Sequence, residues 1–137
     1  MGAAVKIQKD IVERLLVRAR ETPMQECCGL LAGNEGVIST LLAATNAAIA
    51  SATSYEIAPE ETFTLMREMR SAGLDLLGIF HSHPKGVNQP SATDIELAYY
   101  PDTPYFILSP QADVAKPVRA FEIREGKVTE LKIEILA

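Results

Sequence analysis

The strongest constraint on the fold is the apolar run 74–80, which leads directly into the tetrapeptide His-Ser-His-Pro at positions 81–84. The run is too short for an ordinary helix, so it predicts a buried strand that ends at Pro84. Alternate residues of a strand share one face and lie roughly 7 Å apart, at about 3.3 Å per residue. The imidazoles of His81 and His83 would therefore leave the strand end on the same side.

A carboxylate follows these histidines after a short loop. Glycine, asparagine and proline at positions 86–90 mark the loop, and Ser91 opens a predicted helix that runs to about Tyr99. Asp94, in the first turn of that helix, would be folded back toward the histidines. Two imidazoles and one carboxylate make three protein ligands, the usual number for a catalytic zinc, whose remaining position takes a water with a pKa of about 7.

Two simpler interpretations compete with a metal site. An isolated His-x-His tripeptide lies more often on a surface or in a core than on a metal. Ser91 and Asp94 also have the spacing of a capping box, in which the two side chains bind free amides of the first helical turn. From this pair of residues alone, capping and metal binding both remain open.

The whole string resembles the signature of the JAMM (MPN+) metalloproteases: His-x-His-Pro, a glycine two residues later, then Pro-Ser-x-x-Asp, with a separate glutamate far upstream. The resemblance implies that His81, His83 and Asp94 bind Zn²⁺. It implies that Ser91 helps to hold an oxyanion. It further implies that Glu26, which precedes a Cys-Gly-Leu-Leu-like run, is the general base, although by residue type alone other glutamates are equally good candidates.

The resemblance covers residues 26–109, and Asn46 and the run 55–61 also look like the family. It implies an α/β (α+β) fold in which one mixed, curved β-sheet is flanked by helices. It also implies a zinc-dependent peptidase or isopeptidase whose partner is the C-terminal Gly-Gly tail of a ubiquitin-like or sulfur-carrier protein. The loops after Asn46 and at 100–105 are short, as in the minimal stand-alone prokaryotic members.

Other function classes fit the residues less well. A catalytically silent MPN-like scaffold that only binds partners would typically lack the ligand residues, all of which are present. A zinc deaminase would carry His-x-Glu and Pro-Cys-x-x-Cys, but position 83 is histidine and Cys27 and Cys28 are contiguous. The same two cysteines form neither a disulfide framework nor a metal knuckle, and as small buried hydrophobes they argue against a thiol nucleophile.

Hydrophobic periodicity predicts the remaining helices and strands. One helix is predicted over 10–19, with an inner face of Ile11, Val12, Leu15, Leu16 and Ala19. Another is predicted over 59–72, with an inner face of Phe63, Met66 and Met69 or Arg70. Further strands are expected at 5–7, 26–33, 37–45, 105–108, 118–123 and 127–135. The last would place on one face Thr129, Leu131, Ile133 and Ile135, after a hairpin turn at 125–126.

Length and charge limit the partners. A chain of 137 residues predicts one domain, 1–137, and its net charge of −5 with scattered basic residues predicts no nucleic-acid partner. No apolar run approaches the roughly 18 residues of a membrane helix. Residues 1–10 lack a continuous apolar segment, so we expect no secretory signal and a cytoplasmic location. An oligomer is compatible with these features.

Overall fold

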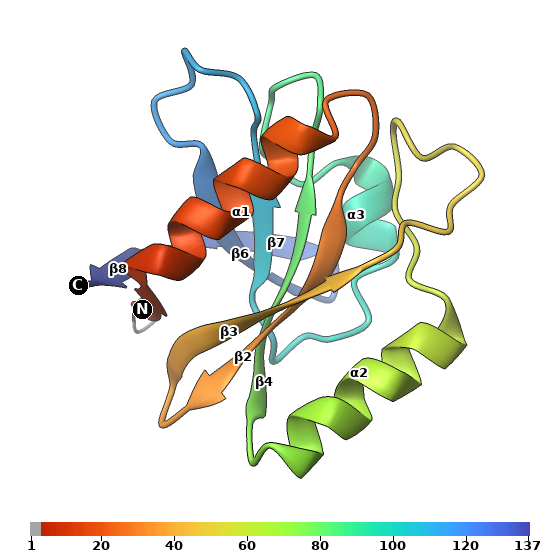
Figure 1. Cartoon of the computed structure of the whole chain (residues 1–137). Coiled ribbons are helices and arrows are strands. Elements are labelled where there is room, and N and C mark those ends of the chain that lie inside the picture. The colour runs from red at the N-terminus through yellow and green to blue at the C-terminus, as the bar shows by residue number, and fades with distance from the viewer. Residues whose placement is uncertain (1–3) are drawn as a thin grey trace.

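The computed structural model describes residues 4–137 and shows one curved sheet with helices packed on both faces (Figure 1). The helices of this range are α1 (Lys9–Glu21), α2 (Pro59–Ser71) and α3 (Ala92–Glu96). Its strands are β1 (Val5–Gln8), β2 (Cys28–Asn34), β3 (Val37–Ala44), β4 (Asp75–Ser82), β5 (Tyr105–Leu108), β6 (Val118–Arg124), β7 (Lys127–Leu131) and β8 (Ile133–Leu136). No helix in residues 4–137 is long and apolar enough to cross a membrane. The mixed, curved sheet flanked by helices is confirmed.

The strand order of the described chain is β7-β6-β5-β4-β2-β3-β1-β8, so β4 lies in the middle of the sheet. It is antiparallel to β2 and parallel to β5. Parallel neighbours need a crossover connection, and the segment between β4 and β5 therefore leaves one end of the sheet and returns to the other, carrying α3 on its way. This crossover begins directly after the two histidines.

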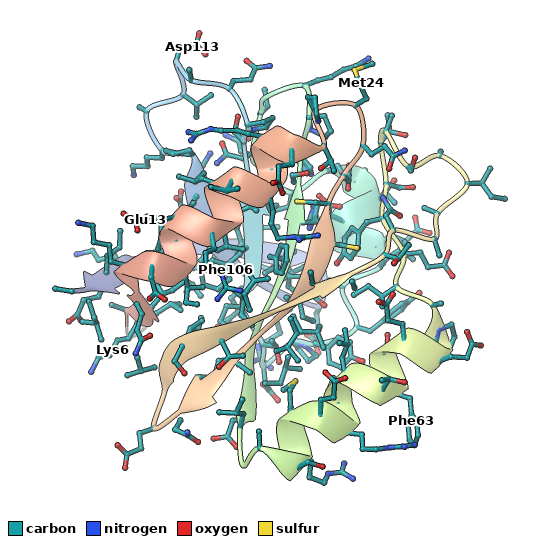
Figure 2. All side chains as sticks on the ribbon, in the orientation of Figure 1. Lys6, Glu13, Met24, Phe63, Phe106 and Asp113 are labelled. Carbon is teal, nitrogen blue, oxygen red and sulfur yellow. The ribbon has the colours of Figure 1, made fainter. Side chains whose placement is uncertain are left out.

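α1 covers one face of the sheet with an apolar stripe. As predicted, the inner positions recur at helical spacing, and those with no exposed surface are Ile11, Leu15 and Ala19. Below them lie Phe80 of β4 and Phe106 of β5, which are also fully buried in the same cluster. Figure 2 labels Phe106 beside α1. The two largest fully buried side chains thus lie between α1 and the central strands.

α2 and α3 pack on the opposite face, over a second apolar cluster. The buried residues of α2 are Leu65 and Met69, and Met66 is partly buried. The prediction that Phe63 faces the core is wrong, because its side chain is 63% exposed and lies against the guanidinium of Arg67. Residues two apart in a helix point about 200° away from each other, so a stripe through Leu65 leaves Phe63 outside.

Two hairpins of the sheet have two-residue turns, and the turn predicted at 125–126 is confirmed. β2 and β3 are joined at Glu35-Gly36, and β6 and β7 at Glu125-Gly126. All four residues have positive φ, between 51° and 79°. Two-residue turns with positive φ at both positions match the twist of the flanking strands.

The continuous strand predicted over 127–135 is wrong, because the chain divides it into β7 and β8. β7 pairs with β6, whereas β8 pairs with β1 at the other end of the sheet. Thr129 and Ile135 are consequently exposed instead of sharing a buried face. Only Lys132 separates the two strands, so the sheet curls until its edges approach each other. A period of two shows that residues are extended, but not which neighbour they pair with.

α3 is shorter than predicted, since it ends at Glu96 and does not reach Tyr99. Pro101 disfavours helical geometry at the preceding residue, Tyr100. The amide of Tyr100 instead donates to the hydroxyl of Tyr105 at 3.1 Å. The chain therefore turns early toward β5, and the tyrosines of this turn stay near the sheet.

Candidate metal centre

β4 carries the two histidines to the end of the sheet. The strand extends two residues beyond the apolar run, and His81 pairs with Cys28 of β2 and Ile107 of β5. His83 continues the ladder, because its backbone N–H donates to the carbonyl of Leu108 at 2.8 Å. Both imidazoles therefore project from one face, as the strand spacing predicts.

Asp94 reaches the imidazoles from the first turn of α3. Its Oδ2 lies 3.2 Å from Nε2 of His81 and 3.0 Å from Nε2 of His83, and these two nitrogens are 3.1 Å apart. The same Oδ2 accepts the N–H of Ser91 at 2.9 Å, and Oγ of Ser91 accepts the N–H of Asp94 at 3.1 Å. The capping box is thus present, and it positions the carboxylate at the imidazoles. The two roles that the sequence left open are compatible.

The hydrogen-bonding pattern of these three side chains calls for a cation. Nδ1 of His83 lies 2.7 Å from the carbonyl oxygen of Val87, which can only accept, so in the neutral imidazole Nδ1 carries the proton and Nε2 presents a lone pair. That lone pair faces an oxygen of Asp94, which is also an acceptor, and the nitrogen of His81. Direct hydrogen bonds cannot satisfy all three contacts at once, whereas a shared metal cation would.

The spacing and the donor types suit zinc. Atoms about 2.0 to 2.1 Å from a tetrahedral zinc lie about 3.3 Å from one another, close to the 3.0–3.2 Å between the nitrogens and Oδ2 here. Two imidazoles with one carboxylate also form a common donor set of catalytic zinc. The side chain of His81 is 1% exposed and that of Asp94 is 7% exposed. The residues present therefore fit this ion, and the packing around the buried side chains restrains them.

The charges of the centre favour a divalent cation. Burial lowers the pKa of His81, so this imidazole is neutral. Burial alone would raise the pKa of Asp94, but its close contacts with the two imidazoles and the hydrogen bond from the N–H of Ser91 bring it below the usual range. Burial also opposes protonation of His83, but contacts with Asp94 and the carbonyl of Val87 raise its pKa. An ionised carboxylate beside two imidazoles is the charge pattern that binds a metal.

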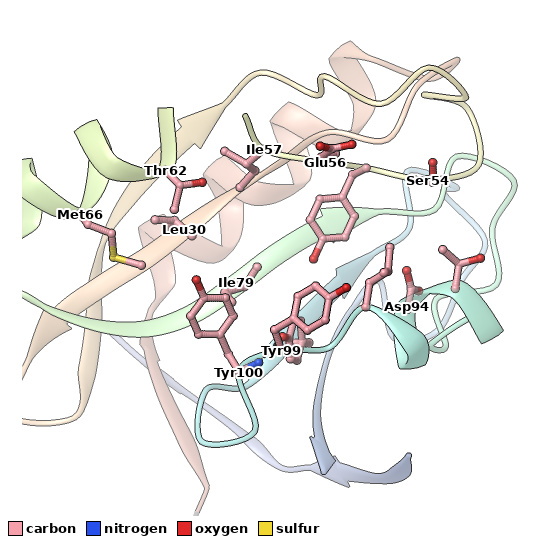
Figure 3. Close-up of a pocket in the computed structure, with 14 residues that line it drawn as sticks. Leu30, Ser54, Glu56, Ile57, Thr62, Met66, Ile79, Asp94, Tyr99 and Tyr100 are labelled. Atoms are coloured by element: carbon pink, nitrogen blue, oxygen red, sulfur yellow. Dashed lines mark hydrogen bonds between the residues drawn. The ribbon is translucent and has the colours of Figure 1, made fainter. Parts of the chain in front are cut away.

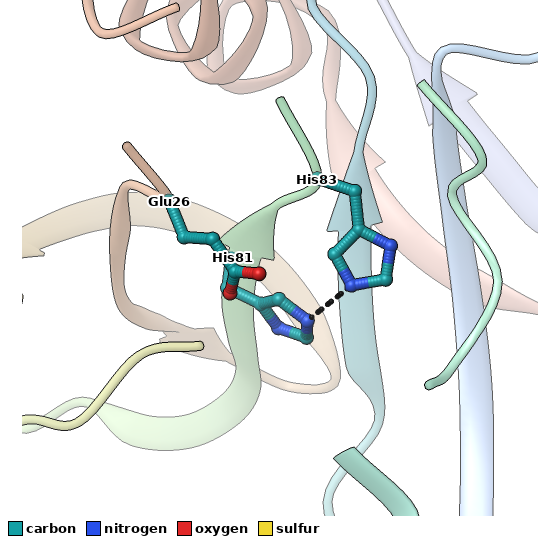
Figure 4. A group of neighbouring side chains, drawn as sticks. All are labelled: Glu26, His81 and His83. Atoms are coloured by element: carbon teal, nitrogen blue, oxygen red, sulfur yellow. Dashed lines mark hydrogen bonds between the residues drawn. The ribbon is translucent and has the colours of Figure 1, made fainter. Parts of the chain in front are cut away.

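Glu26 approaches the histidines from the segment before β2 (Figure 4). One of its oxygens and one nitrogen of each imidazole lie within 4.8 Å of one another. The residue is 4% exposed, and Oε1 has no hydrogen-bond partner among residues 4–137. Burial raises the pKa of Glu26 to about 7, an effect that His83 reduces and Asp94 increases. A carboxyl group of this kind is suited to exchanging protons near neutral pH.

Three contacts fix the backbone around Glu26, which lies just outside the strand predicted to contain it. Its N–H donates to the carbonyl of Ser51 at 2.8 Å, and its carbonyl accepts from Nδ2 of Asn46 at 2.9 Å. The N–H of Cys27 donates to Oγ of Ser82 at 2.9 Å. Ser82, the middle residue of His-x-His, thus ties the glutamate segment to β4. The sequence motifs did not point to this role of Ser82.

A comparison with protein families covers the whole of this centre. The model of the prokaryotic homologs of the JAB domain matches residues 8–124. The chain belongs to this family. The family resemblance of the sequence is thereby confirmed.

Three relatives resemble this member of the JAB family over most of its length. A desampylase of Haloferax volcanii is 38% identical over 115 residues, which are 80% of this chain and 83% of the relative. The CysO-cysteine peptidase of Mycobacterium tuberculosis is 33% identical over 132 residues, 95% and 90% of the two chains. A Thermus thermophilus protein named "Probable TtuB-protein conjugate cleaving protease" is 34% identical over 132 residues, 96% and 84% of the two chains.

A solved structure shows the same fold. The solution structure of a protein from Desulfitobacterium hafniense has a TM-score of 0.84 and 32% sequence identity, and covers 96% of this chain and 92% of its own. The likeness extends over the helices and strands that hold the candidate centre. The arrangement described above is therefore an architecture that a related chain also adopts.

Tyr55 belongs to the centre of this JAB-family chain, although motif spacing did not identify it. Its ring stacks on the imidazole of His81, with 4.4 Å between centroids and 19° between planes. Nδ1 of His81 has no hydrogen-bond partner among the described residues, whereas most metal-binding histidines donate from their second nitrogen. Stacking on Tyr55 therefore orients this imidazole. The family-like run 55–61 was the signal that could have revealed it.

The two cysteines lie beside the centre but are poorly suited to nucleophilic chemistry. Cys27 and Cys28 are free and buried. Burial raises the pKa of Cys28 to about 12 and that of Cys27 above its ordinary value. Since the thiolate is the reactive form, these thiols are inert near neutral pH.

Proposed function

We propose that this chain is a zinc-dependent peptidase or isopeptidase that cuts the bond after the C-terminal Gly-Gly of a ubiquitin-like, sulfur-carrier protein. The proposal depends on one observation above all. Ligand-type atoms of His81, His83 and Asp94 face one another at 3.0–3.2 Å, with the unpartnered Glu26 beside them. Relatives named as peptidase, protease and desampylase support the class of reaction.

The zinc would be held by Nε2 of His81, Nε2 of His83 and Oδ2 of Asp94. When bound, it would polarise a carbonyl oxygen and lower the pKa of a coordinated water to about 7. The ladder on both sides of β4 and the capping box at Ser91 restrain the three ligands. Groups positioned in this way need little rearrangement during the reaction.

Glu26 would move the protons of the reaction. Its buried carboxylate would accept a proton from the attacking water and then donate it to the departing amine. A pKa of about 7 suits both directions of transfer. Proton transfer by a positioned side chain typically contributes about 10²- to 10⁴-fold to the rate.

Ser91 would stabilise the negative charge that develops on the carbonyl oxygen. Its Oγ accepts the N–H of Asp94, so the hydroxyl hydrogen is available to donate elsewhere. Losing one donor of this type usually costs about 10²- to 10³-fold in kcat. Ser91→Ala should therefore lower kcat while the zinc content stays near one per chain.

The substrate class is supported by the names of the relatives. One name joins CysO to a cysteine, and another joins TtuB to a protein. The group on the amine side of the bond differs between these two, so we place the shared recognition on the acyl side, in the Gly-Gly tail. A narrow approach to the zinc would admit only glycine there. We place the reaction in a reducing compartment, the cytoplasm, which suits the two free thiols.

The test uses a peptide ending in Leu-Gly-Gly, with the last glycine linked through an amide to aminomethylcoumarin. Zinc-loaded protein should release the fluorophore, chelator should stop the release, and added zinc should restore it. Glu26→Gln should lose about 10²-fold or more while keeping its zinc, whereas Glu68→Gln, an exposed position on α2, should behave as the wild type. Undiminished hydrolysis by Glu26→Gln would remove that residue from the mechanism. Zinc-loaded wild type without activity on any Gly-Gly substrate would favour the silent scaffold.

A further inference from the structure

A cavity of about 240 Å³ lies next to the metal centre, on the face of the sheet that α2 and α3 cover (Figure 3). Its floor is formed by Leu30 of β2 and Ile79 of β4, and Met66 of α2 closes one side. Tyr55 and Tyr99 add aromatic walls. The proposed mechanism uses none of this space.

The cavity is continuous with the metal centre through shared residues. Ile79 lies two positions before His81 on the same face of β4, and Leu30 is its cross-strand partner. Tyr55 lines the cavity and also stacks its ring on the imidazole of His81. Asp94 belongs to both the cavity wall and the ligand cluster. A molecule held in the cavity would thus extend directly to the reacting bond.

The size and chemistry of the cavity select its occupant. Sites for whole small molecules usually measure roughly 300 to 1,000 Å³, so this smaller space suits a single side chain. Its walls are aliphatic and aromatic, and the carboxylates on its lining, Glu56 and Asp94, disfavour an acidic group. A large apolar side chain fits these properties.

We propose that the cavity binds the apolar side chain of the residue immediately before the Gly-Gly of the substrate tail. In an extended peptide, that residue lies two positions before the glycine whose carbonyl is attacked, roughly 7 Å away. The same two-residue step separates Ile79 in the cavity floor from His81 in the metal centre. The proposal rests on the proposed function, because it assigns the cavity to the acyl side of the same bond. Tails with leucine, methionine or phenylalanine at this position are the preferred substrates.

The test compares tail peptides that differ only at this position. Wild-type protein is assayed on Xaa-Gly-Gly-aminomethylcoumarin peptides with Leu, Ala, Asp or Arg as Xaa. Burial of the larger apolar side chain should raise kcat/KM of the Leu peptide about tenfold to 100-fold above that of the Ala peptide. Asp should be the poorest substrate, because two carboxylates line the space.

Two substitutions on α2 form a matched pair for the same assay. Thr62 lines the cavity, whereas Thr64 on the same helix is exposed. Thr62→Trp should fill the space and abolish the difference in kcat/KM between the Leu peptide and the Ala peptide. Thr64→Trp should leave this difference unchanged. Tyr99→Ala, at a 73% exposed position of the rim, gives a second variant that the fold tolerates and should weaken the Leu preference.

Binding separates failure of this inference from failure of the proposed function. The affinities of fluorescent Leu-Gly-Gly and Ala-Gly-Gly peptides, extended by a lysine, are measured by anisotropy with zinc-loaded Glu26→Gln. A Leu preference that Thr62→Trp removes supports the inference even if wild type cuts neither peptide. Three outcomes would overturn the inference. The Leu and Ala peptides could show equal affinities and equal kcat/KM, or the Arg peptide could be preferred. Alternatively, the rate could depend on the residue after the cleaved bond and not on Xaa.

Discussion

The two faces of the sheet are built differently, although β4 contributes to both. On the α1 face, Phe80 packs in a fully buried apolar cluster. On the opposite face, its neighbour Ile79 lines a cavity, and its other neighbour, His81, keeps a buried nitrogen without a partner among the described residues. One strand thus provides stability on one side and unsatisfied polar groups with open space on the other. Stability and chemistry are separated by the alternation of side chains along a strand.

The largest effect is expected on the open face. His83→Ala removes a proposed ligand that follows β4, so hydrolysis of the Gly-Gly peptide should fall about 10³-fold or more, to the level of chelated protein. Elemental analysis should show loss of zinc. The unfolding midpoint of the chelated variant should equal that of the chelated wild type, because the side chain of His83 lies outside the apolar clusters. Retained zinc would disprove the ligand assignment.

The next effect concerns the packed face. Phe80→Ala should lower the free energy of unfolding by about 3 to 5 kcal/mol, because it leaves a cavity in a core that cannot collapse fully. Phe63→Ala is the matched control, since this phenylalanine is 63% exposed and its loss should cost about 0.5 kcal/mol or less. Urea unfolding of both chelated variants measures the difference. Similar costs for the two would remove the distinction between packed and exposed positions.

Metal removal should have a smaller effect on stability, and this effect should depend on the proposed zinc ligands. Zinc that binds only the folded chain stabilises it by about 2.7 kcal/mol at a free concentration 100 times its Kd. Adding chelator to the wild type should therefore lower Tm, whereas His83→Ala should show no such shift. An equal shift in both would place the zinc elsewhere in the protein.

The smallest effect is expected from thiol reagents. Cys27 contributes to the α1-side cluster, and Cys28 is fully buried near His81. Because burial raises the pKa of both thiols, iodoacetamide at pH 8 should leave native protein unmodified and its activity unchanged. Mass spectrometry before and after denaturation measures the modification. Rapid labelling of native protein with loss of hydrolysis would instead support a cysteine nucleophile.

Local patterns in the sequence were sufficient to predict much of the candidate metal centre. The spacing of His81 and His83 at a strand end predicted that both imidazoles leave one face, and Ser91 with Asp94 predicted the helix start. Glu26 was different, since it is 55 positions before His81 and only the family resemblance singled it out. Its approach to the histidines depends on the antiparallel pairing of β2 with β4, in which Cys28 lies opposite His81. Residue type and spacing carry no information on such a pairing.

The helices and strands themselves follow from short-range rules, because backbone geometry imposes periods of 3.6 and 2 on neighbouring residues. The family and the ligand-type residues could likewise be identified from the chain alone. The tertiary structure decided which strands became neighbours, so it divided residues 127–135 between opposite sheet edges and left Phe63 outside the core. It also decided that Tyr55 stacks on His81 and that a cavity opens beside it. These features arise from contacts between segments far apart in the chain, which no local period encodes.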